Sequence, residues 1–281
     1  MANQNREAEM SFWDHLEDLR WTLFRCIIAL VVFTIGGFIC MRFIFNEIIL
    51  WPTQPDFLLY QALNKLSQIL PFFPDFFSEW KEVEIVNIKL ITQFLLHLTT
   101  SFWVALLLTF PFLMYEVWKF VSPALYEHEK KNFRVVFFFG TIMFFVGCAV
   151  GYFLVFPMAF RFLGGYSLAN VIHQQVSIES YMENFLQLIF VMGIVFEMPL
   201  ICMLLSKLGL LKRSFFNKYR RHAIVGLLVV AAVITPGGDP FTLSVVFFPL
   251  YGLYELSAFF VKKAPKEDED ESTDVVKYGA E

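Results

Sequence analysis

Charged residues are scarce in this chain, and Asp, Glu, Lys and Arg together make up only 17% of its 281 residues. Hydrophobic residues make up 57%, and they are gathered into long apolar runs. A helix needs about 20 consecutive apolar residues to cross the hydrocarbon layer of a bilayer. The composition therefore excludes an ordinary soluble domain and predicts an all-α polytopic membrane protein.

The motifs of common enzyme and cofactor sites are also missing. The four cysteines form no C-x-x-C pair, and all lie in apolar runs: Cys26, Cys40, Cys148 and Cys202. His128-Glu129 begins like a zinc-protease helix but lacks the second histidine, and no G-x-x-x-x-G-K-[ST] phosphate loop occurs. Asp239 has no second intramembrane aspartate to form a catalytic pair. We expect no enzyme activity, no metal, no other cofactor and no nucleic-acid partner.

Six apolar runs are predicted to be transmembrane helices, at about 21–45, 91–118, 133–156, 181–205, 222–236 and 241–261. The fifth run would be only ~22 Å long as a helix, which is shorter than the ~30 Å hydrocarbon layer. Long segments between the runs predict structured outer loops at 46–87 and 157–178, the first with a short helix at 56–70. The remaining segments divide the chain into a cytoplasmic N-terminal amphipathic helix at 1–20, a membrane domain at 21–261 and a disordered charged tail at 262–281.

The distribution of lysine and arginine predicts the orientation. Only five of the 22 basic residues fall in the candidate outer segments: Arg42, Lys65, Lys81, Lys89 and Arg161. Because basic residues are retained on the cytoplasmic side of a membrane, both termini are predicted to be cytoplasmic.

A carboxylate in the fourth apolar run is the most unusual feature of the sequence. Glu197 lies inside the run and is followed by Pro199, which removes a backbone hydrogen-bond donor. Ionisable groups at such positions are costly and usually serve a function. Glu197 could form a polar docking site for a partner, the proton site of a proton-coupled small-solute transporter, or a protonated group hydrogen-bonded to a neighbouring helix. The sequence shows no internal repeat, which disfavours the inverted-repeat transporters.

Acidic residues also occur on the predicted cytoplasmic side, where basic residues dominate. Glu17 and Asp18 precede the first run, and Glu127 and Glu129 lie between the second and third. Separated carboxylates could bind a ligand that carries two arginines, because guanidinium groups match carboxylates in geometry and charge. Physical chemistry alone favours a simpler explanation, in which Asp18 pairs with Arg20 or Arg25 and Glu129 pairs with Lys130 or Lys131 as weak surface pairs.

Four motifs occur in order along the chain: HLEDLR at 15–20, FVSPALYEHEKK at 120–131, FEMP at 196–199, and ITPGGDPFTL with PLYGLYE within 234–255. Together they resemble the motifs of the TatC family, the large membrane subunit of the twin-arginine protein translocase. HLEDLR at 15–20 is similar to the family's H-L-x-E-L-R signature, and FVSPALYEHEKK at 120–131 is similar to its first inner loop. FEMP at 196–199 resembles the F-E-x-P of the fourth span, and ITPGGDPFTL with PLYGLYE, within 234–255, resembles the family's C-terminal motifs. The resemblance covers about 11–261.

The resemblance implies a role for each matching residue. Asp18 and Glu129 stand where the family binds the twin arginines of signal peptides, with Glu17 as an alternative to Asp18. The residues implied to line or shape the same site are Arg20, Phe120, Pro123, Leu125, Tyr126 and Lys130. Glu197, with Pro199, is implied to meet single-span partner subunits, and Asp239 lies in the outer turn before the last span. The chain departs from the family pattern in having Asp18 for Glu, Gly237-Gly238 before Asp239, and Leu243 in place of the usual Gln.

The function implied by the resemblance is export of folded proteins. The chain would be the receptor and core subunit, binding Arg-Arg signal peptides at the cytoplasmic face of a bacterial inner membrane. Its partners would be TatA- and TatB-like single-span subunits, membrane lipid and further copies of the chain. The proton-motive force would drive transport.

Overall fold

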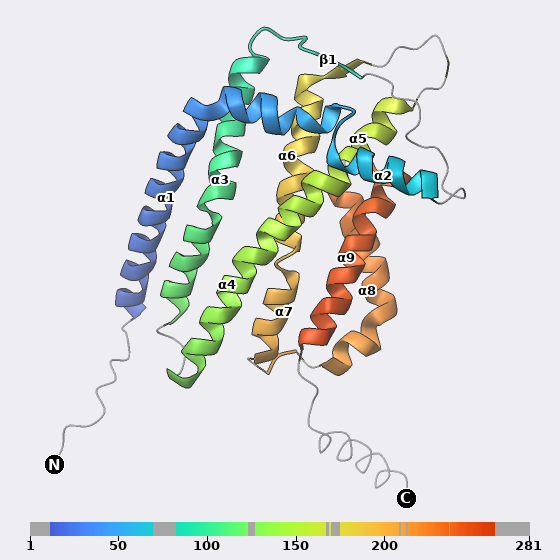
Figure 1. Cartoon of the computed structure of the whole chain (residues 1–281). Coiled ribbons are helices and arrows are strands. Elements are labelled where there is room, and N and C mark those ends of the chain that lie inside the picture. The colour runs from blue at the N-terminus through green and yellow to red at the C-terminus, as the bar shows by residue number, and fades with distance from the viewer. Residues whose placement is uncertain are drawn as a thin grey trace, which may run out of the picture. The chain divides into compact units, whose positions relative to one another are not determined.

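The computed structural model describes residues 12–69, 83–122, 127–166, 169, 175–207, 209–211, 213–235 and 237–261. The described chain is almost entirely helical (Figure 1). It divides into two compact units. Unit 1 contains 1–142 and 167–186, and unit 2 contains 143–166 and 187–281. Two helices, α4 (Glu127–Val150) and α6 (Ile178–Val195), begin in unit 1 and end in unit 2.

Two long antiparallel helices form most of unit 1. α1 (Phe12–Phe43) and α3 (Thr92–Val121) lie side by side along their lengths (Figure 1). They approach closely at Gly37, where a Cβ atom would lie 3.3 Å from the carbonyl oxygen of Ser101. One turn away, the rings of Phe38 and His97 stack with their centroids 4.0 Å apart, and His97 Nε2 lies 3.0 Å from the carbonyl oxygen of Phe38. Small and flat side chains therefore bring the two backbones together.

The chain after α1 turns through short helical segments that are fixed by aromatic residues. A π-helical turn (Ile44–Ile49) and a 3-10 turn (Trp51–Thr53) lead to α2 (Leu58–Ile69), which confirms the short helix predicted at 56–70. The buried Tyr60 donates a hydrogen bond to the carbonyl oxygen of Pro52 at 2.9 Å. Tyr181, also buried, donates one to Ile49 at 2.5 Å and so holds this turn against the start of α6.

A short parallel β-ribbon joins two segments that are far apart in the sequence. β1 (Glu84–Val86) pairs with β2 (Gln175–Ser177) in the register Glu84 to Gln175. The Gln175 side-chain amide also donates to the Glu84 carboxylate at 2.9 Å. Beside the ribbon, Glu179 accepts hydrogen bonds from Lys89 Nζ and from the Thr92 hydroxyl, both at 2.9 Å. This end of unit 1 is thus cross-linked by backbone and side-chain bonds together.

The helices of unit 2 cross at glycines. Gly147 and Gly151, at the end of α4 and the start of a π-helical turn (Gly151–Val155), are separated by the spacing of a small-xxx-small contact. A Cβ on Gly147 would lie 2.6 Å from the Met192 carbonyl oxygen, and one on Gly193 would lie 2.6 Å from Cys148 Sγ. Only glycine permits such an approach, so this crossing fixes the second half of α6 in place.

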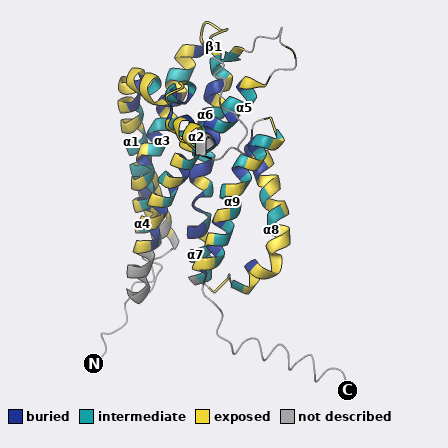
Figure 2. Ribbon diagram, turned by 45° about the vertical axis from the view of Figure 1, so that its right-hand side comes forward, coloured by how far each residue is buried: buried dark blue, intermediate teal, exposed yellow. Residues whose placement is uncertain are grey.

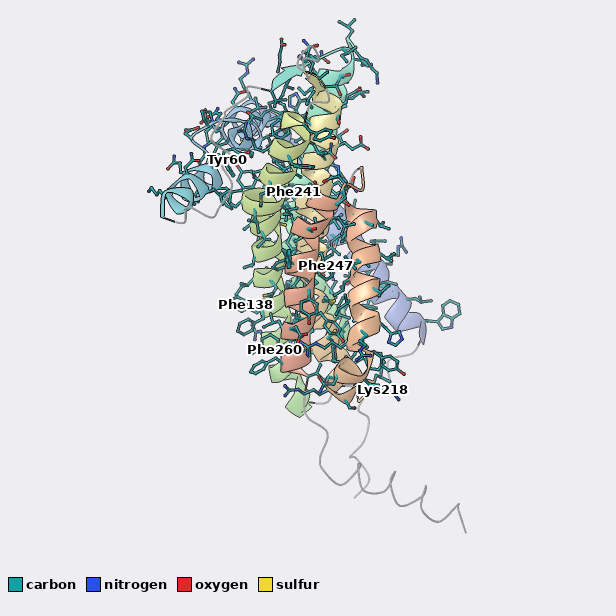
Figure 3. The ribbon with its side chains drawn as sticks, turned by 90° about the vertical axis from the view of Figure 1, so that its right-hand side faces the viewer. Tyr60, Phe138, Lys218, Phe241, Phe247 and Phe260 are labelled. Carbon is teal, nitrogen blue, oxygen red and sulfur yellow. The ribbon has the colours of Figure 1, made fainter. Side chains whose placement is uncertain are left out.

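The last helices of unit 2 form an antiparallel pair. α7 (Met198–Lys207) and α8 (Arg213–Ile234) both pack against α9 (Pro240–Phe260). α5 (Phe156–Gly165) also contacts α9, and the rings of Phe162 and Phe241 stack at 4.4 Å (Figure 3). Within the described residues, five helical segments are long and apolar enough to span a membrane, and α8 is not among them.

Several predicted boundaries need correction. The third span continues as α4, a π-helical turn and α5 to Gly165, so the loop predicted from 157 begins later. α8 begins at Arg213 rather than near 222, because the basic residues there continue the helix. The fourth span, predicted as one run, is broken into α6 and α7 just before Pro199, whereas the sixth agrees with prediction within one residue. The predicted tail at 262–281 lies outside the described residues.

Candidate functional site

The first turns of α1 present the predicted acidic residues to solvent. Glu17, Asp18 and Arg20 are all exposed. Among the described residues, no ion pair joins Asp18 to a cation. Its carboxylate is therefore available for an external cation, and the weak surface pair with Arg20 is not formed.

The register of α1 against α3 determines what lies level with these acids. Because Phe38 contacts His97 and Arg25 contacts Glu116 in the antiparallel pair, Asp18 lies level with the last turn of α3. That turn carries Phe120, which is half-buried. α4 begins shortly afterwards, with Glu129 and Lys130 in its first turn. The predicted site residues on α1, α3 and α4 thus gather at one end of unit 1.

Some predicted site residues cannot be placed. Pro123, Leu125 and Tyr126 lie outside the described residues. For Glu129 and Lys130 the structure describes the helical backbone only. The predicted roles of these five residues stay predictions.

An ion pair between α1 and α3, with a buried carboxylate and a partly exposed guanidinium, was not predicted. The guanidinium of Arg25 on α1 donates through Nε and Nη2 to one oxygen of Glu116 on α3, at 2.9 and 2.7 Å. Nη2 also reaches the Thr22 hydroxyl at 3.1 Å. Glu116 is 3% exposed, so its charge is neutralised inside the helix pair. The alternative in which Arg25 pairs with Asp18 is wrong, because Glu116 occupies that guanidinium.

A signal for this pair does exist in the sequence. Arg25 and Glu116 are isolated charges inside apolar helices, and such charges usually have a partner. Pairing them required knowledge of the register of α1 against α3, which comes from packing. Arg25 also lies two helical turns after Asp18, about 10 Å along the same face of α1. Its charge interacts with Asp18.

The second candidate site is the break between α6 and α7. α6 ends at Val195 and α7 begins at Met198, so Glu197 lies in the turn between them. Pro199 is buried just after the break and cannot donate a backbone hydrogen bond. Glu197 is 9% exposed, and neither of its carboxylate oxygens has a hydrogen-bond partner among the described residues. A hydrogen bond from Glu197 to a neighbouring helix, the simplest of the three readings, is therefore not observed in the described part of the chain.

The turn before α9 has a structural explanation. Asp239 caps α9 by accepting a hydrogen bond from the Thr242 backbone amide at 2.7 Å. Gly237 and Gly238 both have positive φ, at 90° and 60°. Glycine adopts such backbone angles readily, which explains the two glycines that precede Asp239 in this turn. Gln187 on α6 donates to the carbonyl oxygen of Ile234, the last residue of α8, at 3.1 Å. This contact is not predicted by any pattern in the sequence.

No group of three metal-binding side chains occurs in the part of the chain that the structure describes. The two candidate sites are instead an exposed acidic surface and a buried, unpartnered carboxylate. The family model of the Sec-independent protein translocase protein TatC matches residues 14–249, which include both. The chain belongs to the TatC family. It is thus a multi-pass membrane subunit of a protein translocase, and the family transports proteins and is not enzymatic.

Relatives support the assignment over nearly the whole chain. The TatC protein of Blattabacterium sp. subsp. Periplaneta americana is 34% identical over 268 residues, covering 92% of this chain and 99% of that protein. The TatC protein of Escherichia coli K12 is 32% identical, covering 88% of this chain and 86% of its own length. A crystal structure of the twin-arginine translocase receptor TatC in DDM matches with a TM-score of 0.69 at 28% identity, over 88% of this chain and 99% of that one.

Proposed function

We propose that this TatC-family chain is the receptor and core subunit of a twin-arginine translocase, and that it binds Arg-Arg signal peptides at the exposed acidic end of unit 1. The observation that carries the proposal is the free Asp18 carboxylate, level with the end of α3 and close in sequence to Glu17. Glu129, in the first turn of α4, would bind the second arginine. Arg20, Phe120, Pro123, Leu125, Tyr126 and Lys130 would shape the surface around them.

The charges near Asp18 support a preference for arginine. Arg25 is the cation nearest to Asp18 on the same face of α1, and its guanidinium is occupied by Glu116. Arg25 is therefore bound elsewhere, and the exposed Asp18 carboxylate stays open to an incoming guanidinium. Two carboxylates on separate helices would hold two arginines with charge-assisted hydrogen bonds in fixed directions, which lysine cannot match.

Glu197 is proposed as the docking point for a TatA- or TatB-like single-span subunit. A buried carboxylate without a partner carries a desolvation cost, which a hydrogen-bond donor from a second chain would offset. The same property would suit the proton site of a small-solute transporter. Membership of a protein-translocase family favours the docking role.

We also propose the membrane in which the chain acts, its orientation and the state of its substrates. The membrane is a bacterial inner membrane, both termini are cytoplasmic, and the substrates cross in the folded state. The distribution of basic residues supports this orientation. The absence of a phosphate-loop motif from the sequence is consistent with no ATP use by this chain, and the proton-motive force is proposed to drive transport. Further copies of the chain are expected in the complex.

The test is binding of a signal peptide carrying Arg-Arg to the purified chain in detergent, compared with the same peptide carrying Lys-Lys. We expect clearly tighter binding of the Arg-Arg peptide, and loss of the difference in Asp18→Ala or Glu129→Ala. Glu17→Ala, assayed in parallel, determines which of the adjacent acids takes the first arginine. Equal binding of both peptides would reject the receptor role for this surface.

A further inference from the structure

α8 has two distinct faces, and only one of them is used in the fold. The face toward α9 carries the buried residues Phe216, Ala231 and Ile234. On the same side, Arg220 pairs with Glu255 at 2.5 Å and donates to the Tyr251 hydroxyl at 3.2 Å. The Tyr254 hydroxyl on α9 also donates to the Phe216 carbonyl oxygen at 2.8 Å. These contacts fix the rotation of α8 about its axis.

The opposite face of α8 is exposed along its whole length (Figure 2). Its residues recur at intervals of three or four, which places them on one side of the helix. The first half of this face is polar and the second half is apolar: Ser214, Lys218, Arg221 and His222, then Val225, Val229 and Val233. Val225, Val229 and Val233 are 61%, 59% and 76% exposed.

The positive charge of this face is not balanced by acidic residues in the part of the chain that the structure describes. No acidic residue occurs between Glu197 and Asp239. Glu255, the acid that reaches α8, is taken by Arg220. Among the described residues, Lys218 and Arg221 have no acidic partner, and Lys218 lies 5.8 Å from the ring centroid of Tyr219 (Figure 3).

The length of α8 determines the depth of these cations in the bilayer. Its apolar part, 223–234, would span only ~18 Å of the ~30 Å hydrocarbon layer. Because charged side chains are costly in the hydrocarbon layer, we expect the basic turns at the level of the lipid headgroups, with the valines beside the acyl chains. This arrangement of cations above an apolar stripe matches the layout of a phospholipid, with its anionic phosphate above its hydrocarbon chains.

We propose that the exposed face of α8 is a binding site for an anionic phospholipid. Ser214, Lys218 and Arg221 hold the headgroup phosphate, and Val225, Val229 and Val233 support an acyl chain. Charge complementarity selects an anionic lipid over a zwitterionic one, since basic clusters beside membrane helices attract acidic headgroups. The site is independent of the signal-peptide surface, which lies in the other unit.

The experiment is native mass spectrometry of the full chain, released from micelles that contain equal amounts of phosphatidylglycerol and phosphatidylcholine with the same acyl chains. We expect the parent to retain phosphatidylglycerol preferentially. Lys218→Gln/Arg221→Gln should reduce that preference on the order of tenfold, since each basic residue near the surface contributes several-fold in affinity. Val225→Ser/Val229→Ser should reduce retention of the lipid without changing the headgroup preference.

The matched control is Arg42→Gln/Lys65→Gln, which removes the same charge from two exposed residues of unit 1. It should behave like the parent. Equal retention of the two lipids by the parent would overturn the proposal. It would also be overturned if the Lys218/Arg221 and Arg42/Lys65 double variants lost the same amount of headgroup preference, because that would indicate a general effect of net charge. The last measurement adds glycerol phosphate as a soluble competitor. If it displaces phosphatidylglycerol completely, the site binds a soluble phosphate instead of a lipid. If instead a single-span helix co-purifies with the chain and protects α8 from hydrogen exchange equally in the parent and in the charge variants, the face binds a protein and the proposal is overturned.

Discussion

Glu116 and Glu197 are the same chemical group in two different situations. Both are buried among apolar residues, at 3% and 9% exposure, Glu116 within α3 and Glu197 in the turn between α6 and α7. Glu116 is held by the Arg25 guanidinium within the α1–α3 pair, whereas Glu197 has no hydrogen-bond partner among the described residues. Burial alone therefore does not mark a functional carboxylate. The distinction lies in whether the fold itself satisfies the charge.

This comparison predicts opposite effects on stability. Arg25→Gln would leave Glu116 buried without a cation, and uncompensated buried charges are strongly destabilising. We expect the midpoint of thermal unfolding in detergent to fall by roughly 5–10 °C. Arg25→Gln/Glu116→Gln should recover most of the loss. Lys89→Gln, which breaks an exposed pair with Glu179, is the control and should change the midpoint little. A similar fall of the midpoint in Lys89→Gln would show that the loss is not specific to the buried Glu116 carboxylate.

Glu197→Ala should show the reverse pattern. The unfolding midpoint should stay constant or rise, because a buried group with no partner is removed. Export of a twin-arginine substrate should fall about tenfold, because a lost hydrogen bond to a buried charged group is worth this much. Glu197→Gln keeps the size of the side chain and part of its hydrogen-bonding capacity, so its export should be intermediate. Normal export by the alanine variant would show that Glu197 is only tolerated by the fold.

Glu116→Gln should weaken signal-peptide binding through a different residue. It would release the Arg25 guanidinium, which lies on the same face of α1 as Asp18 and can then compete with the peptide. We expect Arg-Arg peptide affinity to fall roughly fivefold, by about 1 kcal/mol, and the fall to be smaller at high salt. Arg25→Gln/Glu116→Gln should restore affinity. An unrestored double variant would mean that the pair acts only on stability.

The smallest effect concerns a neutral group on α6, the helix that precedes Glu197. Gln187→Leu removes the hydrogen bond to the Ile234 carbonyl oxygen at the end of α8. We expect a loss of about 1 kcal/mol in stability, typical of one hydrogen bond. Protection of the amides near 234–238 from hydrogen exchange should fall, while Gln187→Glu tests whether an acceptor at this position is worse than an apolar group. No change in exchange would assign the stability of this turn to the Asp239 cap.

The sequence predicted what depends on local composition. Apolar length located the helices, and the motifs at 15–20 and 196–199 indicated the family. It failed where two distant segments must be matched. Arg25 and Glu116 were each visible as isolated charges, but only the register between α1 and α3 brings them together. The fifth run is predicted to begin at 222, but α8 begins at Arg213, because lysine and arginine are good helix formers.

The β1–β2 ribbon has a consequence for biosynthesis. Its strands are parallel neighbours in space, yet Glu84 and Gln175 are 91 positions apart. At ribosomal rates of about 5–20 residues per second, β1 leaves the ribosome roughly 5–20 s before its partner exists. During that interval the strand must wait with its backbone groups hydrated while α3 and α4 are inserted. The ribbon therefore forms late in synthesis, when β2 and the start of α6 have left the ribosome.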